Sequence, residues 1–469
     1  MPTMEFEMNN LRYQRSVMIS MSTAAFLVAF VASSLNLAIP KIVAEFSLST
    51  FSLSLVMCAY LLSTSIFQMP AARLADLVGR KKVFITGIFV FGAFSFLCTL
   101  ATSGGLLMVM RFCMGIGSAM MFGTNMAILT AVFPPEKRGM AIGINTAVVY
   151  FSLAIGPFAG GSIAHYWDWR GIFYFCAILA LAAGASAIVA IKQEWTEAKG
   201  EPFDFIGSAM YSLSLSGVIY GFTTLPSVAG CICLALGLAG MAVFVRYERH
   251  CRYPILKINL FFNNPGFALS SLAAMINYAA TFAVSFLISL YLQYIKGMDA
   301  QQAGLLLVVQ PVFQCALSVL VARLMHWIKP VWLASLGMAM VTLGIFGLCF
   351  LEETTSLAYL AVVLALLGIG FGIFSSPNST IIMTSVGKQD YSTASATTGT
   401  VRMVGQALSI AIGAMTIYSQ LGDIPIENAP LAGLLSGVNI AFSVFVCLCL
   451  VGIYASFARF KRIEPKPGR

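Results

Sequence analysis

The sequence predicts an all-α protein that crosses a membrane many times. Of its 469 residues, 59% are hydrophobic and only 10% are charged, and the mean hydropathy is +0.89. A soluble globular domain has about 45–50% apolar and about 25% charged residues. Nearly uncharged stretches of roughly 20 residues, the length an α-helix needs to span a bilayer, recur along the whole chain. This composition excludes a soluble enzyme with an unusually apolar core.

Fourteen apolar stretches are expected to form the membrane-spanning helices. The first one follows a polar start and is too long for the apolar region of a signal peptide, so we expect it to stay as an uncleaved helix. The stretches cover residues 17–39, 51–70, 83–101, 105–131, 140–162, 171–191, 205–224, 228–245, 267–292, 305–322, 331–350, 357–378, 393–418 and 432–457.

The positions of Lys and Arg predict how these helices are oriented. If the N-terminus is cytoplasmic, 22 of the 27 Lys and Arg residues fall in cytoplasmic segments and three in external loops, and Arg111 and Arg402 fall inside helices. Such a bias follows the positive-inside rule, so both termini are expected in the cytoplasm. The net charge of +9 is explained by this bias, and the expected partners are the lipid bilayer and a small-molecule substrate, without nucleic acid.

A weak internal repeat predicts two similar halves. The segments "AARLADLVGRKKVF" (71–84) and "VARLMHWIKPVWL" (321–333) share Ala-Arg-Leu at corresponding helix ends, and duplicated halves are typical of secondary transporters. We therefore expect a cytoplasmic N-terminus (1–16), a six-helix bundle (17–191), two inserted helices with flanking cytoplasmic segments (192–266), a second six-helix bundle (267–457) and a basic cytoplasmic tail (458–469).

Motifs of soluble catalysis are missing from the sequence. It has no phosphate-binding loop, no HExxH, no GxSxG and no Cys/His cluster with metal-ligand spacing. Ten of the eleven cysteines lie in apolar stretches without a pairing pattern, which indicates buried thiols. We expect neither an enzyme nor an ATP-driven pump, and no cofactor apart from H⁺ as a possible coupling ion.

Several motifs, in their order along the chain, resemble the major facilitator superfamily and most of all its fourteen-helix drug:proton antiporter branch. They are "LNLAIPKIVAEF" (35–46), "RLADLVGRKK" (73–82), Arg111 with Gly115 and Gly117, "AIGPFAGG" (154–161), "FDFIG" (203–207), "SLYLQYIKGMDAQQAG" (289–304) and "GIGFGIFSSPNS" (368–379). The resemblance implies the major facilitator fold, with a central cavity between two bundles, and multidrug efflux by alternating access.

The resemblance also implies roles for two groups of residues. In the loop after the second helix, Asp76, Gly79 and Arg80 are expected to act as a latch that holds one conformation. In the fifth helix, a glycine-proline motif is expected to make a tight contact with the other bundle; its residues are Gly156, Pro157, Gly160 and Gly161. Positive-inside anchoring and ordinary helix packing are the alternative explanations for these two groups.

Two arginines are expected inside the membrane. Arg111 lies about 10 Å from the external end of its helix and Arg402 about 13 Å from the cytoplasmic end of its own, at 1.5 Å per residue. An arginine at such depth costs about 2.5–3.5 kcal/mol, so both are candidates for substrate binding or coupling. A structural arginine that is satisfied by backbone carbonyls is the alternative.

The expected carboxylate of the antiporter branch is missing. That branch usually carries Asp five residues before the Asn of "NLAIP", and this chain has Val31 there; none of its 18 acidic residues falls in the middle of a predicted helix. Two functions stay open. One is the proton-coupled export of amphipathic compounds of the multidrug type. The other is export of an anionic, zwitterionic or lipid-like metabolite with atypical or no proton coupling.

Neutral polar residues in apolar stretches complete the candidate site. Because each needs a hydrogen bond inside hydrocarbon, we expect them to face the interior of the bundles. The candidates for substrate binding or coupling are Asn36, Gln68, Asn125, Asn145, Tyr150, Gln310 and Asn378, with Asn277, Gln314 and Gln406 as further polar groups and Met120, Met121, Phe122, Phe282, Phe286 and Phe313 as possible lining. A monomer in the plasma or inner membrane is expected.

Overall fold

The computed structural model describes residues 11–325, 327–387, 391–422, 424 and 430–458, and regular structure in these ranges is entirely helical. Fourteen helices in these ranges are long and apolar enough to cross a membrane, which confirms the predicted architecture. An even number of crossings leaves both ends of the chain on the same side. Residues 1–10 and 459–469, which belong to the predicted cytoplasmic termini, lie outside the described residues.

The first half of the chain forms six long helices and one short one. They are α2 (Leu11–Ser34), α3 (Ile39–Phe46, after a 3₁₀ turn at Leu35–Leu37), α4 (Thr50–Val78), α5 (Arg80–Thr99), α6 (Gly104–Val132), α7 (Pro135–Tyr166) and α8 (Arg170–Ala190). Helix α4 runs eight residues beyond the predicted stretch, with Pro70 inside it, and ends only at Gly79. The predicted loop of residues 71–82 is therefore mostly helical.

The second half contains more breaks than the apolar pattern indicated. Its helices are α11 (Asn259–Asn263), α12 (Pro265–Thr281), α13 (Ala283–Leu290), α14 (Ala300–Leu307), α15 (Val309–Leu324), α16 (Pro330–Leu348), α17 (Leu357–Thr384), α18 (Tyr391–Leu421) and α19 (Leu431–Ala458). The predicted stretch 267–292 is divided at Phe282, because the amide of Ala283 donates to Ser409 Oγ on α18 at 2.8 Å. It ends in a π-helical turn at Tyr291–Ile295.

Short polar side chains set where many helices begin. The hydroxyls of Ser49, Ser103, Ser227 and Ser356 each accept a hydrogen bond from the amide three residues later, and Asp204, Asn264 and Asp299 do the same with side-chain oxygens. The first amides of a helix have no partner within the helix, so these caps define each start.

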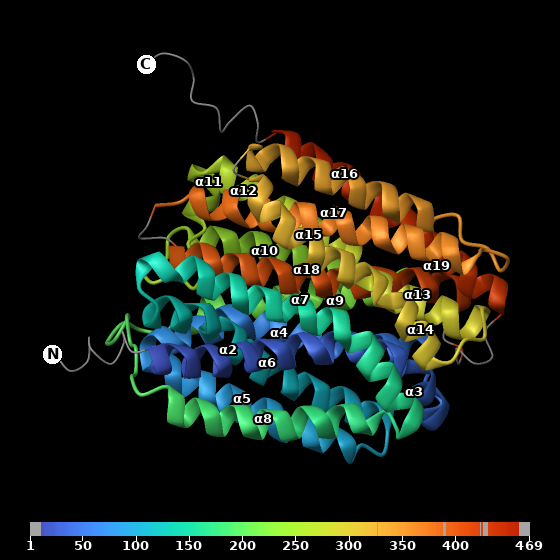
Figure 1. Ribbon diagram of the computed structural model, residues 1–469, viewed down its shortest axis with the longest axis horizontal. Coiled ribbons are helices and arrows are strands. Elements are labelled where there is room, and N and C mark those ends of the chain that lie inside the picture. The colour runs from blue at the N-terminus through green and yellow to red at the C-terminus, as the bar shows by residue number, and fades with distance from the viewer. Residues whose placement is uncertain (1–10, 326, 388–390, 423, 425–429, 459–469) are drawn as a thin grey trace.

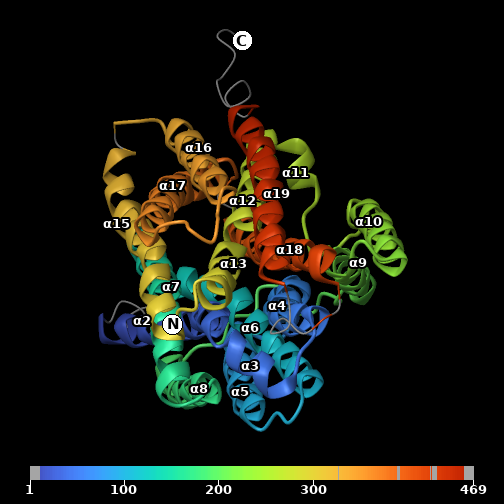
Figure 2. The same cartoon turned by 90° about the vertical axis from the view of Figure 1, so that its right-hand side faces the viewer.

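The helices form two groups with a helical hairpin at their edge. Seen along the helices, α2 and α4–α8 lie on one side, and α12 and α15–α19 lie on the other (Figure 2). The inserted hairpin of α9 (Phe205–Thr224) and α10 (Val228–Glu248) lies beside them, where α9 packs on α4 and α18. The two groups touch through α7 with α14 and α15, and through α4 with α18. Helices α3, α13 and α14 gather at one end of the molecule (Figure 1).

Candidate functional site

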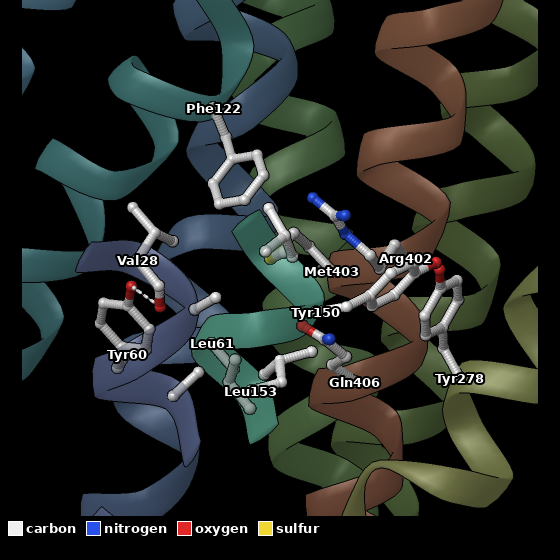
Figure 3. Close-up of a pocket in the computed structure, with 13 residues that line it drawn as sticks. Val28, Tyr60, Leu61, Phe122, Tyr150, Leu153, Tyr278, Arg402, Met403 and Gln406 are labelled. Carbon is white, nitrogen blue, oxygen red and sulfur yellow. Dashed lines mark hydrogen bonds between the residues drawn. The ribbon is translucent and has the colours of Figure 1, made fainter. Parts of the chain in front are cut away.

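A small cavity lies where the two groups of helices meet (Figure 3). Helices α2, α4, α6 and α7 supply one wall, and α12 and α18 supply the other. The lining residues are Val28, Ala29, Ala32, Tyr60, Leu61, Phe122, Val149, Tyr150, Leu153, Tyr278, Arg402, Met403 and Gln406. A mostly apolar and aromatic cavity with a few polar groups is the usual form of a small-molecule site.

Arg402 is the single charged residue among those that line this cavity. Its Cζ atom lies 4.6 Å from the ring centroid of Phe122, and its Nε atom is buried without a hydrogen-bond partner. The face of an aromatic ring attracts a guanidinium but does not neutralise its charge. The lining therefore carries one positive charge and no carboxylate.

Two tyrosines opposite Phe122 are held in place by neighbouring helices. The hydroxyl of Tyr150 on α7 is hydrogen-bonded to Ser375 on α17, a contact between the two halves. The rings of Tyr150 and Tyr278 both meet Phe371 edge-on, at centroid distances of 6.3 and 5.4 Å. Aromatic rings fixed in this way form a preformed wall, which lowers the entropy cost of binding a flat ligand.

The other predicted arginine lies behind the wall of the cavity. Arg111 is 2% exposed, and its Cζ atom lies 5.9 Å from the ring centroid of Tyr60, whose ring lines the cavity. Its Nε and Nη1 atoms have no hydrogen-bond partner. The Tyr60 hydroxyl donates to the carbonyl of Val28 at 3.1 Å and pairs with Ser118 Oγ at 2.7 Å. Both arginines were candidates for substrate binding or coupling, but only Arg402 lines the cavity.

Among the predicted neutral polar residues, Tyr150 and Gln406 line the cavity, and the others are buried elsewhere. Asn125 Nδ2 donates to the carbonyl of Met21 at 2.8 Å, and Asn378 Nδ2 donates to that of Ser270 at 3.1 Å. Both amides therefore connect neighbouring helices within one half, which is the helix-packing role that hydrogen-bonding side chains often have in membranes.

Three of the remaining predicted residues, Asn36, Gln68 and Gln310, lie at contacts between helices, and two, Gln68 and Asn145, have an unpaired oxygen. The backbone carbonyl of Asn36 accepts a hydrogen bond from Ser289 Oγ at 2.8 Å, which links α13 to the 3₁₀ turn after α2. Gln68 Oε1 and Asn145 Oδ1 are buried without a partner, and Gln68 faces Gly399 on α18. The carbonyl of Gln310 packs against Gly368.

The face of α2 that borders the cavity is apolar. Val28, Ala29 and Ala32 line it, and Val31, at the position that is acidic in the antiporter branch, is 1% exposed. Val31 is not itself among the lining residues, and none of the residues that line the cavity is acidic.

The predicted latch residues are bound by the linker that follows α8. Arg80 is 3% exposed, and its guanidinium pairs with Asp76 and with Glu197 of the linker, both at 2.8 Å. Glu194 Oε1 accepts the amide of Lys81 at 2.8 Å at the start of α5. Gly79 has a φ of 124°, and a Cβ there would lie 2.4 Å from Glu194. In the described residues the ion-pair partners of Arg80 therefore belong to the first half and its linker.

The glycine-proline motif of α7 divides between two partners, which corrects the expectation that all four residues contact the other bundle. A Cβ at Gly156 or Gly160 would meet Ser33 or Ser34 of α2, in the same half. Residues four apart share a face of a helix, so Pro157 and Gly161 lie on the next face. That face contacts α14 of the other half: Gly161 meets the carbonyl of Ala300, and Gly304 meets that of Pro157.

Comparisons with known proteins identify the family. A family model described as Major Facilitator Superfamily matches residues 21–410. The chain belongs to the major facilitator superfamily. It is 28% identical over 410 residues to the multidrug resistance protein Stp of Mycobacterium tuberculosis, which covers 86% of this chain and 75% of Stp. It is 26% identical over 399 residues to the riboflavin transporter RibZ of Clostridioides difficile, covering 84% and 86%.

Solved structures of the superfamily share this fold. A bacterial homologue of the human lysosomal transporter Spinster, in an inward-facing and unoccupied conformation, superposes with a TM-score of 0.68 at 16% identity. The match covers 98% of this chain and 100% of that chain. The protein is therefore a multi-pass membrane transporter of the superfamily and not an enzyme.

Sequence reasoning missed two aromatic lining residues, Tyr60 and Tyr278. Each lies in an apolar stretch, where a tyrosine needs a partner for its hydroxyl, so the same argument that selected Tyr150 applies to them. Phe122 was one of six candidates, and only the packing of α6 against α18 separates it from the rest.

Proposed function

We propose that the protein is a secondary active exporter of small amphipathic organic compounds that carry an anionic or zwitterionic group, and that it works by alternating access. One observation carries this proposal: Arg402 is a partly desolvated cation in a cavity whose lining residues include no carboxylate. An uncompensated buried charge is costly, and a ligand anion offsets this cost.

The remainder of the lining supports an apolar or aromatic body for the ligand. Phe122, Tyr150 and Tyr278 offer flat faces, and Gln406 offers a donor and an acceptor beside them. The relatives named for multidrug resistance and riboflavin transport also handle organic compounds. A cationic drug fits this lining less well, because it would meet Arg402 without a compensating carboxylate.

Coupling to H⁺ is part of the proposal and rests on the family resemblance. Both walls of the cavity come from one chain, so we expect a monomer to suffice. The cell membrane is the expected location.

The proposal is tested with the purified protein in liposomes that contain a pH-sensitive dye. Transport of an aromatic carboxylate is compared with that of a lipophilic cation, with and without a pH gradient. We expect saturable transport of the carboxylate, accompanied by H⁺ movement. In Arg402→Gln this transport should fall by at least about tenfold, since a charged hydrogen bond contributes about 1.5–3 kcal/mol, and Arg402→Lys should recover part of it.

The matched control is Arg252→Gln, which removes an exposed arginine that lies over Tyr253 at 5.4 Å and is not among the residues that line the cavity. It should transport like the wild type. Cation transport that survives in Arg402→Gln, with no transport of the carboxylate by the wild type, would refute the anionic substrate. Carboxylate transport that ignores the pH gradient would refute H⁺ coupling alone.

A further inference from the structure

Two carboxylates face each other at the cytoplasmic end of the inserted hairpin. Asp204 precedes α9 and Glu248 ends α10, and they are 9% and 2% exposed. A methyl group placed on Gly207 would lie 2.3 Å from Asp204 Oδ2 and 2.5 Å from Glu248 Oε1. These two oxygens are therefore at most 4.8 Å apart, the sum of the two distances. Neither residue borders the cavity described above.

The oxygens of Asp204 are satisfied, but one oxygen of Glu248 is not. Asp204 Oδ1 accepts hydrogen bonds from the Gly207 amide at 2.8 Å and the Tyr247 hydroxyl at 3.1 Å. Glu248 Oε2 accepts the amide of Leu256 at 3.3 Å. Glu248 Oε1 is buried near Asp204 Oδ2 and has no hydrogen-bond partner among the described residues. A buried unpaired carboxylate oxygen is rare enough to need an explanation.

Positive charge does not provide that explanation. Within the described residues, neither carboxylate forms an ion pair, with Lys257 or with any other base. Two arginines of the adjoining segment contact aromatic rings instead: Arg249 lies 4.5 Å from the Phe262 ring centroid, and Arg252 lies over Tyr253.

The other titratable groups beside the pair act as hydrogen-bond donors or turn away from it. Cys251 Sγ donates to Asp204 Oδ2 at 3.5 Å, and burial raises the pKa of this thiol, so it keeps its proton. The Tyr247 hydroxyl also donates to Asp204. His250 Nδ1 is bonded to the carbonyl of Arg246 at 2.9 Å. Among the described residues, the pair therefore has hydrogen-bond donors that stabilise one negative charge and no cation that neutralises a second one.

We propose that Asp204 and Glu248 form a proton-binding site, in which one proton is shared between Asp204 Oδ2 and Glu248 Oε1. Two carboxylate oxygens this close are unfavourable when both groups are charged, because like charges repel. A proton from cytoplasmic water forms one O–H bond to a carboxylate oxygen and a hydrogen bond to the other. This satisfies the unpaired oxygen and leaves one negative charge for the donors around Asp204.

The site lies where both chain connections between the halves meet. Asp204 ends the linker whose Glu197 pairs with Arg80 and whose Glu201 pairs with Arg73 at 2.6 Å. Glu248 holds the amide of Leu256, on the segment that leads to α11 and α12. The shared proton therefore joins Asp204 to Glu248, whose other oxygen binds Leu256, and holds residues 249–258 against the start of α9. We call this connection the clasp; it is closed when the proton is shared. Because the closed clasp binds one proton more than the open one, its stability falls by about tenfold per pH unit as the pH rises from the titration of the open state to that of the closed state. Above both titrations it is constant.

Infrared spectroscopy of the full-length protein in nanodiscs tests the site without any transport assay, so its outcome is independent of the proposed function. The protonated pair should give a carboxylic-acid carbonyl band that disappears between about pH 5 and about pH 9, the range of buried carboxyls. Glu248→Gln and Asp204→Asn should both lack this band. The asparagine retains the helix cap, so it remains informative if the glutamine variant folds poorly. The matched control is Glu353→Gln, at an exposed external carboxylate, which should keep the band.

Hydrogen exchange of residues 249–258 reports on the clasp itself. After correction for the intrinsic pH dependence of exchange, protection in the wild type should fall by up to about tenfold per pH unit as the pH rises toward the titration of the band, and level off above it. In Glu248→Gln the amide replaces the shared proton, and protection should stay constant. A band that persists in both pair variants would overturn the proton site. Protection in Glu248→Gln that follows the wild-type pH profile would overturn the clasp.

Discussion

Arg402 and Phe122 meet across the interface between the two halves, with the guanidinium carbon on α18 lying 4.6 Å from the ring centroid on α6. The contact gives the cation a partner that does not cancel its charge. A ligand anion can therefore bind Arg402 while the ring continues to pack against it. The same contact links α6 to α18, so ligand binding and the closing of the two halves act on the same pair of residues.

Substitution of Phe122 by Leu should weaken substrate binding. A cation–π contact contributes about 0.5–2 kcal/mol, so we expect KM for the transported anion to rise about 2- to 30-fold. Phe122→Tyr retains the ring face and should stay close to the wild type. Initial rates in liposomes over a range of substrate concentrations measure this. An unchanged KM in Phe122→Leu would show that the ring does not support the site.

Substitution of Gly161 by Ala should prevent the two halves from closing against each other at the external end, where α7 contacts α14. Its Cβ would lie 2.5 Å from the carbonyl oxygen of Ala300, a backbone atom that cannot rotate away. We expect transport to fall at least about tenfold, because about 1.4 kcal/mol of strain in the closed state already shifts the equilibrium that far. The matched control is Gly143→Ala on the same helix, where a Cβ meets nothing within 4 Å. Equal transport rates in the two variants would contradict this contact.

Substitution of Gly79 by Ala should destabilise the loop after α4. The backbone there has a φ of 124°, and the new Cβ would lie 2.4 Å from the Glu194 carboxyl. We expect a loss of about 1–3 kcal/mol from strained backbone and displaced Glu194, read as a lower Tm in detergent. Gly200→Ala separates the two causes, since its φ is also positive, at 90°, but the space around it is open. It should lower the Tm less.

Acid should weaken the external contact between Glu45 and Arg170. Hydrogen bonds from Arg170, at 2.6 and 2.8 Å, lower the pKa of the Glu45 carboxyl below its ordinary value of 4.5. When folding lowers the pKa of a carboxyl, its charged form stabilises the fold fully at pH values above the pKa of the unfolded chain. This stabilisation is lost as the pH falls through the lower pKa of the folded state. The Tm of the wild type should therefore drop below about pH 4.5, by an amount worth at most about 1 kcal/mol at this exposed site.

In Glu45→Gln, part of this acid-dependent drop in Tm should disappear, whereas in Glu353→Gln the wild-type profile should remain. A wild-type acid profile in Glu45→Gln would contradict the assignment. The comparison needs only thermal unfolding curves at a series of pH values in the same detergent.

Much of the candidate site is visible in the sequence because burial in lipid makes polar residues conspicuous. Arg402, Tyr150 and Gln406 were selected for that reason, and they line one cavity. The same signal also selected Asn125 and Asn378, whose amides connect helices instead. A polar residue in an apolar stretch must find a partner, but the sequence does not say whether that partner is a backbone carbonyl or a ligand.

By itself, the sequence determined the membrane architecture and the family: hydrocarbon thickness dictates the length of each apolar stretch, and lysine and arginine avoid translocation. Tertiary structure decided which side chains meet. Only the packing of helices distant in sequence separates Arg402 in the cavity from Arg111 behind Tyr60, and brings Asp204 against Glu248. The physical reason is that hydropathy acts on each helix alone, whereas a site is made by the faces that several helices turn toward each other.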